Sequence, residues 1–261
     1  MIETFVALLS AHALADFVLQ GRWIMQEKRR LLGMAVHAIL VAFTAALALG
    51  MPITFASDAS LAVLIATLAH VLIDRAKISL SNTRQARSNP LSDFQLFLLD
   101  QLAHVTTLGG IAVLCSQAWS QGHWGSLSPA TQPLALAALS LLAGSVLVVR
   151  AGGFVVDLLL KGLQPRPSGP REARPEPQPD DGLPGGGAWI GMLERSLILF
   201  LVLVQQFEAI GFLIAAKSIL RFRTDQNRSF SETVIIGTLA SFTWAIVISW
   251  ITLLAITHFL Q

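Results

Sequence analysis

The sequence predicts an all-α protein, a polytopic transmembrane helical bundle of about six to eight spans. Of its 261 residues, 54% are hydrophobic and 13% are charged, whereas soluble domains carry roughly a quarter charged residues. Runs of mostly apolar residues follow one another, each long enough to cross a hydrocarbon core about 30 Å thick. The net charge of +2 does not favour a nucleic-acid partner. The single cysteine, Cys115, excludes an intrachain disulfide and a cysteine-based metal centre.

Basic loops set the expected topology of the N-terminal unit, residues 1–162. Its five spans are expected near 2–20, 31–51, 59–80, 92–116 and 133–162. Lys and Arg gather in the loops after the first, third and fifth spans. The loop at 52–58 carries only Asp58, and the loop at 117–132 has no charged residue. The positive-inside rule therefore places the N-terminus outside and the basic loops in the cytoplasm, in a bacterial inner membrane.

A proline-rich segment separates this unit from the rest of the chain. Residues 163–187, "LQPRPSGPREARPEPQPDDGLPGGG", hold seven of the eleven prolines. This composition predicts a flexible cytoplasmic linker. In the C-terminal membrane unit, 188–261, the segment 188–222 is expected to enter and return, as two short helices turning near "QQFE" or as a re-entrant hairpin. A last span is expected at 232–258.

Three pairs of ionisable residues interrupt the apolar segments at helical spacing. The phrase "AHALAD" in the first span is nearly repeated as "AHVLID" in the third, and the fourth span carries the reversed order in "DQLAH". Residues four apart share one face of a helix, so each pair presents an imidazole and a carboxylate to the same neighbour or ion. The pairs are His12 with Asp16, His70 with Asp74, and Asp100 with His104.

The expected topology brings these pairs to one depth. Spans one and three run inward, so their histidines lie deeper than their aspartates; span four runs outward and carries the reversed motif. His37, early in span two, falls level with the aspartates. All seven groups are therefore predicted to occupy one slab in the inner half of the bilayer. Spans 1–2 and 3–4 form a parallel pseudo-repeat, which is imperfect because Gly33 stands where a fourth aspartate is expected.

A layer of histidines and aspartates at one depth of the membrane favours a metal site. Ionisable groups inside a membrane cost about 2.5–3.5 kcal/mol each on insertion scales, so they usually face a cavity and have a function. Imidazole and carboxylate without thiolate suit a divalent ion, with zinc expected first and manganese or iron as alternatives. The predicted ligands are His12, His37, His70 and His104. Asp16, Asp74 and Asp100 are predicted as further ligands, as partners that orient the histidines, or as the general base.

Three functions remain open at this point. A membrane-embedded, metal-dependent hydrolase of a lipid or phosphoester would use the ion to activate water. A cation- or proton-coupled transporter would use the same groups as an ion path. A scaffold would pair them to hold helices together. Haem would also accept histidines in a helical bundle, but it leaves the three aspartates unexplained. The hydrolase is the favoured hypothesis.

A lipid-phosphate substrate would also need cationic contacts. "GMLER" opens the C-terminal unit with Glu194 and Arg195, which point to different helix faces because they are adjacent. Lys217 follows within an apolar stretch. Arg195 and Lys217 are the predicted contacts for a substrate anion, and snorkelling to the interface is the alternative for Lys217.

The quoted motifs also resemble a known family. "SAHALADFVLQ", the isolated His37, "AHVLIDRAKI" and "FLLDQLAH" resemble the bacterial integral-membrane family catalogued as domain of unknown function 3307. The C-terminal "IGMLERSLILFLVL", "IGFLIAAKSILRF" and "IIGTLASF" resemble it too. The resemblance implies a helical membrane protein and no defined activity. A short-motif similarity to membrane-bound metal-dependent hydrolases and zinc phospholipase C-type enzymes implies metal chemistry at the His/Asp helices.

Overall fold

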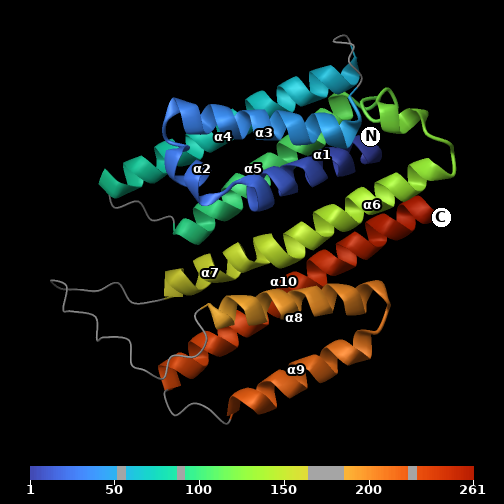
Figure 1. The fold of residues 1–261 in the computed structure, drawn as a ribbon. Helices are drawn as coiled ribbons and strands as arrows, with labels where there is room; N and C mark the ends of the chain where they lie inside the picture. Colours follow the sequence, from blue (N-terminus) through green and yellow to red (C-terminus); the bar gives the residue numbers. More distant parts are fainter. Residues whose placement is uncertain (52–56, 87–91, 164–184, 223–227) are drawn as a thin grey trace. The chain divides into compact units, whose positions relative to one another are not determined.

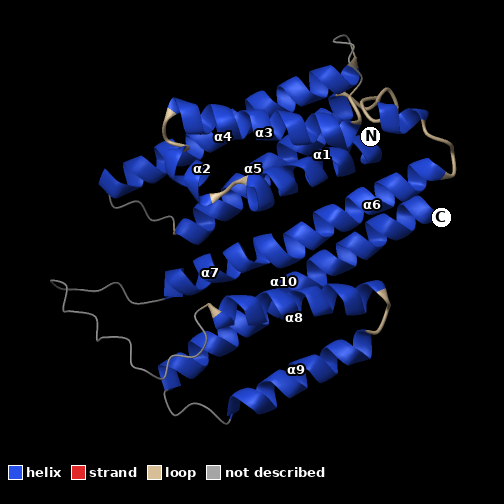
Figure 2. Cartoon of the chain, viewed as in Figure 1, coloured by secondary structure: helices blue, strands red, loops and turns tan. Residues whose placement is uncertain are grey.

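The computed structural model describes residues 1–51, 57–86, 92–163, 185–222 and 228–261, without the side chains of 83–86 and 219–231. Within these residues every regular element is a helix, which confirms the predicted all-α class (Figures 1 and 2). The elements are α1 (Ile2–Leu14), η1 (Ala15–Leu19), α2 (Arg22–Glu27), α3 (Leu31–Leu49), α4 (Asp58–Ala86), α5 (Asp93–Leu114), η2 (His123–Ser126), α6 (Thr131–Val146), η3 (Leu147–Ala151), α7 (Gly152–Leu163), α8 (Gly186–Leu203), α9 (Phe207–Phe222) and α10 (Arg228–Leu260).

Seven helical segments of the described chain are long and apolar enough to cross a membrane, so this is a multi-pass membrane protein. They are Ile2–Leu19, Leu31–Leu49, Asp58–Asn82, Asp93–Leu114, Thr131–Leu163, Gly186–Leu203 and Glu232–Leu260. Six of them coincide with the spans expected from the sequence. The seventh, α8, is the first arm of the expected C-terminal reversal.

The chain forms two compact units, one of residues 1–147 with 250–261 and the other of residues 148–249. In the first unit, α1, α3, α4 and α5 close a ring, because α1 packs on α3 and α5, and α4 packs on the same two helices (Figure 1). Helix α6 lies against the outside of α1. The ring has one apolar half, filled mainly by small residues such as Ala11, Ala45, Ala62 and Ala66. Small side chains let membrane helices approach closely.

Contacts at one end of the ring fix the direction of each helix. The amino group of Met1 contacts the carbonyl oxygen of Ser116, which lies just after α5. Trp124 Nε1 donates to the carbonyl oxygen of Leu47 near the end of α3, and the amide of Asp58 at the start of α4 donates to Gln121. Helices α1 and α4 therefore run one way and α3 and α5 the other, as the reversed "DQLAH" motif requires.

The second unit holds α7, α8, α9 and most of α10. Helices α8 and α9 are separated by residues 204–206, where Gln205 has a φ of 59°. The turn falls at "QQFE", as both alternatives expected, and α8 and α9 are the two arms of the reversal.

Packing groups the helices by a criterion other than the linker that defined the sequence division. It groups α7 with the C-terminal helices and the last residues of α10 with the first unit, and the division at 162 and 188 stays a prediction. A proline-rich stretch indicates where the chain leaves regular structure, but helix packing decides which elements share a core. Most of the linker predicted at 163–187 lies outside the described residues.

Candidate metal centre in the four-helix ring

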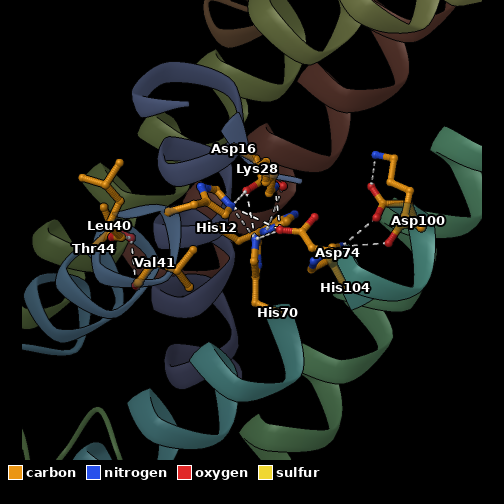
Figure 3. Close-up of polar contacts among 12 residues, drawn as sticks. His12, Asp16, Lys28, Leu40, Val41, Thr44, His70, Asp74, Asp100 and His104 are labelled. Atoms are coloured by element: carbon orange, nitrogen blue, oxygen red, sulfur yellow. Dashed lines mark hydrogen bonds and ion pairs between the residues drawn. The ribbon is translucent and has the colours of Figure 1, made fainter. Parts of the chain in front are cut away.

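Each helix of the ring contributes one histidine to a common centre. His12 comes from α1, His37 from α3, His70 from α4 and His104 from α5. All four are at most 4% exposed. The ring of His70 has its centroid 4.3 Å from that of His104, 5.0 Å from that of His37 and 5.4 Å from that of His12. His70 is thus the middle of the cluster, and Figure 3 shows Asp16 and Asp74 beside it.

The tightest part of the site is a group of four ligand atoms from three helical segments. The Nε2 atoms of His37 and His70 lie 2.9 Å apart. Asp16 Oδ1 is 3.3 Å from the first nitrogen and 3.2 Å from the second. Asp74 Oδ2 is 3.4 Å and 3.5 Å from the same two atoms. Each of the two carboxylate oxygens therefore lies close to both imidazole nitrogens.

The other two histidines each have an oxygen acceptor beside one ring nitrogen. His104 Nδ1 donates to the carbonyl oxygen of Asp100 at 2.8 Å, so its Nε2 carries the lone pair. His12 Nε2 contacts Gln101 Oε1 at 3.4 Å and donates to it, which leaves the lone pair on Nδ1. That Nδ1 lies 3.9 Å from Asp16 Oδ2, another acceptor. A backbone or side-chain acceptor on one ring nitrogen commonly fixes the other nitrogen for metal binding.

Buried polar atoms without a hydrogen bond concentrate in this cluster. In the described part of the chain there are eight such side-chain atoms, and six belong here. They are His12 Nδ1, Asp16 Oδ1, His37 Nδ1, Asp74 Oδ2, Asp100 Oδ1 and His104 Nε2. A buried group left unsatisfied costs about 1–3 kcal/mol, and more when it is charged. One of the six, Asp74 Oδ2, has an ion pair with Lys28, and the concentration of the other five in one place points to a ligand.

Local structure places the carboxylates. Asp16 lies in the π-helical segment η1, which widens the helix at that turn; single π-helical turns occur frequently at functional sites. On α3, Gly33 stands where a fourth aspartate was expected. A Cβ at this position would overlap the backbone of Glu27, the last residue of α2. The next residue, Lys28, pairs with Asp74 at 2.6 Å between Nζ and Oδ2.

The structure thus brings together all seven predicted residues, His12, Asp16, His37, His70, Asp74, Asp100 and His104. Three overlapping groups of them have ligand atoms within 4.8 Å of one another: His12, Asp16, His70 and His104; His37, His70 and Asp74; and Asp74, Asp100 and His104. The role of each residue stays a prediction.

Arg195 and Lys217, the predicted anion contacts, lie in the second unit with partners of their own. The guanidinium of Arg195 donates from Nε and Nη2 to the carbonyl oxygen of Val149, at 3.2 and 2.9 Å, and from Nη1 to Ser241 Oγ at 3.2 Å. Lys217 pairs with Glu194 and lies over the ring of Phe242. Adjacent Glu194 and Arg195 therefore do have different partners. Their contact with a substrate stays a prediction.

Three polar residues at the site were not among those expected. Lys77 is 2.7 Å from Asp100 Oδ2 through its Nζ, and Gln101 Nε2 donates to the same oxygen at 3.0 Å. Helical spacing could have identified Lys77, which continues the face of His70 and Asp74 at positions i+7 and i+3. Gln101 stands inside the "DQLAH" motif. No local spacing identifies Lys28, because it reaches the cluster only through the reversal of the chain after α2.

Comparison with protein families finds one whose model matches residues 4–132, and its description is Protein of unknown function (DUF3307). The match covers α1 to α5 and therefore the whole cluster. Neither a curated protein nor a solved structure matches the chain.

Proposed function

We propose that in this chain, whose residues 4–132 match the family of unknown function DUF3307, the His/Asp cluster holds a divalent metal ion and hydrolyses a lipid or phosphoester. The observation that supports this most is the spacing around His37 and His70, whose Nε2 atoms lie 2.9 Å apart, with an oxygen of Asp16 and an oxygen of Asp74 each 3.2 to 3.5 Å from both nitrogens. Ligands that share one ion at about 2.0–2.2 Å lie roughly 2.8–3.6 Å apart for bond angles between right-angled and tetrahedral.

The donor set also suits zinc, with manganese or iron as alternatives. Neutral imidazole binds zinc, copper, iron and nickel, and carboxylate oxygens extend the choice to manganese. Zinc with histidine and carboxylate ligands is the arrangement of many hydrolytic sites. An ion held here would polarise a phosphoryl or acyl oxygen and lower the pKa of a bound water.

The remaining side chains of the cluster would orient the metal ligands and accept protons. His104 is held by its Nδ1–H on the carbonyl of Asp100, so Nε2 faces the cluster as a base. Gln101 joins His12 to Asp100 and fixes both. A base in a hydrolase has to lie within hydrogen-bond reach of the attacking water, and His104 belongs to two groups whose ligand atoms lie within 4.8 Å of one another. We therefore assign His104 as the base, with His12 as its alternative.

A cation- or proton-coupled transporter is the second candidate. The chain of carboxylates and imidazoles from Asp16 to Asp100 ends at two lysines, an arrangement that a proton or cation path would also use. In either case we place the chain in a bacterial inner membrane with its N-terminus outside and the linker in the cytoplasm. Ion- or pH-driven flux in proteoliposomes, without hydrolysis, would favour the transporter.

The hydrolase is tested by an activity screen on the full chain in detergent. We expect release of product from phospholipid or phosphoester probes when zinc, manganese or iron is added, and loss of release after chelation. His70→Ala should remove the activity, while His258→Ala, an exposed residue near the end of α10, should keep it. Equal release from wild type and His70→Ala would overturn the proposal.

A further inference from the structure

Two lysines reach from the end of the ring into the cluster. Lys28, directly after α2, has its Nζ 2.6 Å from Asp74 Oδ2, and its side chain is 12% exposed. Lys77 on α4 pairs with Asp100 at 2.7 Å and is 37% exposed. Lysines near helix ends normally extend their ammonium groups towards water. Lys28 instead directs its ammonium group to a carboxylate that is 5% exposed.

The fold is shaped to allow this approach. A Cβ on Gly33 would overlap the backbone and the Cβ of Glu27, so glycine lets the end of α2 lie directly on α3. Lys28 follows Glu27 and therefore enters at the level where the other three helices carry aspartates. Where the pseudo-repeat would place a fourth aspartate, at Gly33, the site instead receives the ammonium group of Lys28.

Charge at the site is close to balance but not neutral. With the histidines neutral, three carboxylates and two ammonium groups leave one negative charge. The carboxylate without a cation is Asp16, whose ion-pair partners among the described residues are histidines alone. One divalent ion beside Asp16 turns this single negative charge into a single positive one. Two ions would leave three positive charges in a buried site, which is unfavourable.

We propose that the metal-loaded site binds the phosphate group of a substrate, and that Lys28 is its cationic contact. The inference rests on the proposed metal site. The loaded site carries a buried positive charge that an anion neutralises, and charge-assisted hydrogen bonds from an ammonium group suit phosphate oxygens. The oxygen that Lys28 holds, Asp74 Oδ2, is also the one that faces His37 and His70 at 3.4 and 3.5 Å.

This shared oxygen distinguishes Lys28 from Lys77. Asp74 Oδ2 could hold either the ion or the Lys28 ammonium, so Lys28 would be free to contact a phosphate oxygen when the ion is bound. Lys77 holds Asp100 Oδ2, the oxygen that Gln101 also binds. Lys28 therefore contacts the anion, and Lys77 keeps Asp100 in place.

The test is phosphate binding to the full chain in lipid nanodiscs, with one equivalent of zinc and after chelation. The two probes are inorganic phosphate and phosphatidate in a neutral lipid. We expect calorimetric binding of at least one probe to the loaded protein, and at least tenfold weaker binding to the chelated protein. Binding of both probes identifies the free phosphate group as sufficient, and binding of phosphatidate alone identifies a lipid headgroup.

Variants separate a phosphate contact from a structural ion pair. Lys28→Met should keep its zinc and lose phosphate affinity by at least tenfold, and Lys28→Arg should recover most of it. The control is Lys161→Met, which removes an exposed pair with the same nitrogen–oxygen distance, that of Lys161 with Asp157 at 2.6 Å. This control should bind as wild type does.

Three results would overturn the inference. They are loaded wild type that binds neither probe, chelated wild type that binds equally well, and a zinc-loaded Lys28→Met variant with wild-type affinity. The result on loaded wild type does not depend on whether any variant folds. A wild type that takes up no metal would overturn the proposed function as well, whereas metal uptake without phosphate binding would overturn this inference alone.

Discussion

Both units of this chain bury charged side chains in membrane-spanning helices, but the buried groups differ in how fully they are hydrogen-bonded. In the second unit, Arg195 is 4% exposed and donates three hydrogen bonds, to Val149 and Ser241. In the first unit, six buried polar atoms of the His/Asp cluster have no hydrogen bond, and only one of them, Asp74 Oδ2, has an ion pair with a lysine. A charge with partners serves the fold, whereas a cluster of acceptors facing one another indicates a ligand that the protein itself does not provide.

The largest effect on stability is expected in the second unit. Arg195→Met leaves the Val149 carbonyl without its donors, and we expect a loss of about 2–4 kcal/mol in the free energy of unfolding. The metal content should not change. Thermal unfolding in detergent, with Lys161→Met as the control, measures the loss of stability. Elemental mass spectrometry measures the metal content. Loss of metal in a folded Arg195→Met variant would contradict the contrast between the units.

A smaller effect of opposite sign is expected at Asp16. Asp16→Asn removes the carboxylate that has no cation among the described residues, so the metal-free protein should become more stable, by about 1–3 kcal/mol. The same variant should lose the stabilisation that added zinc gives to wild type, which is about 2.7 kcal/mol at a free concentration of 100 Kd. Unfolding midpoints with zinc and with chelator give both values. A destabilised metal-free variant would show that Asp16 is a structural partner.

Much of this arrangement could be predicted from the sequence, because it follows from helical spacing. Apolar runs located six of the seven candidate spans, and the i, i+4 pairs with the reversed order of Asp100 and His104 indicated one common depth. These are properties of single helices and of alternating direction, which the chain carries locally.

What the sequence did not reveal depends on contacts between elements. Lys28 reaches Asp74 through the approach of α2 to Gly33, and the π-helical turn at Asp16 appears only in three dimensions. The grouping of α7 with the C-terminal helices is likewise set by packing. A proline-rich stretch next to it pointed to a different boundary.

Metal content tests the central claim most directly. The full chain, purified in mild detergent beside His70→Ala and the exposed-histidine control His258→Ala, would be analysed by elemental mass spectrometry after zinc, manganese and iron are offered. We expect close to one ion per chain in wild type and in His258→Ala, and none in a His70→Ala variant that is still folded. Wild type without metal, or equal metal in His70→Ala, would show that the His/Asp cluster is not a metal centre.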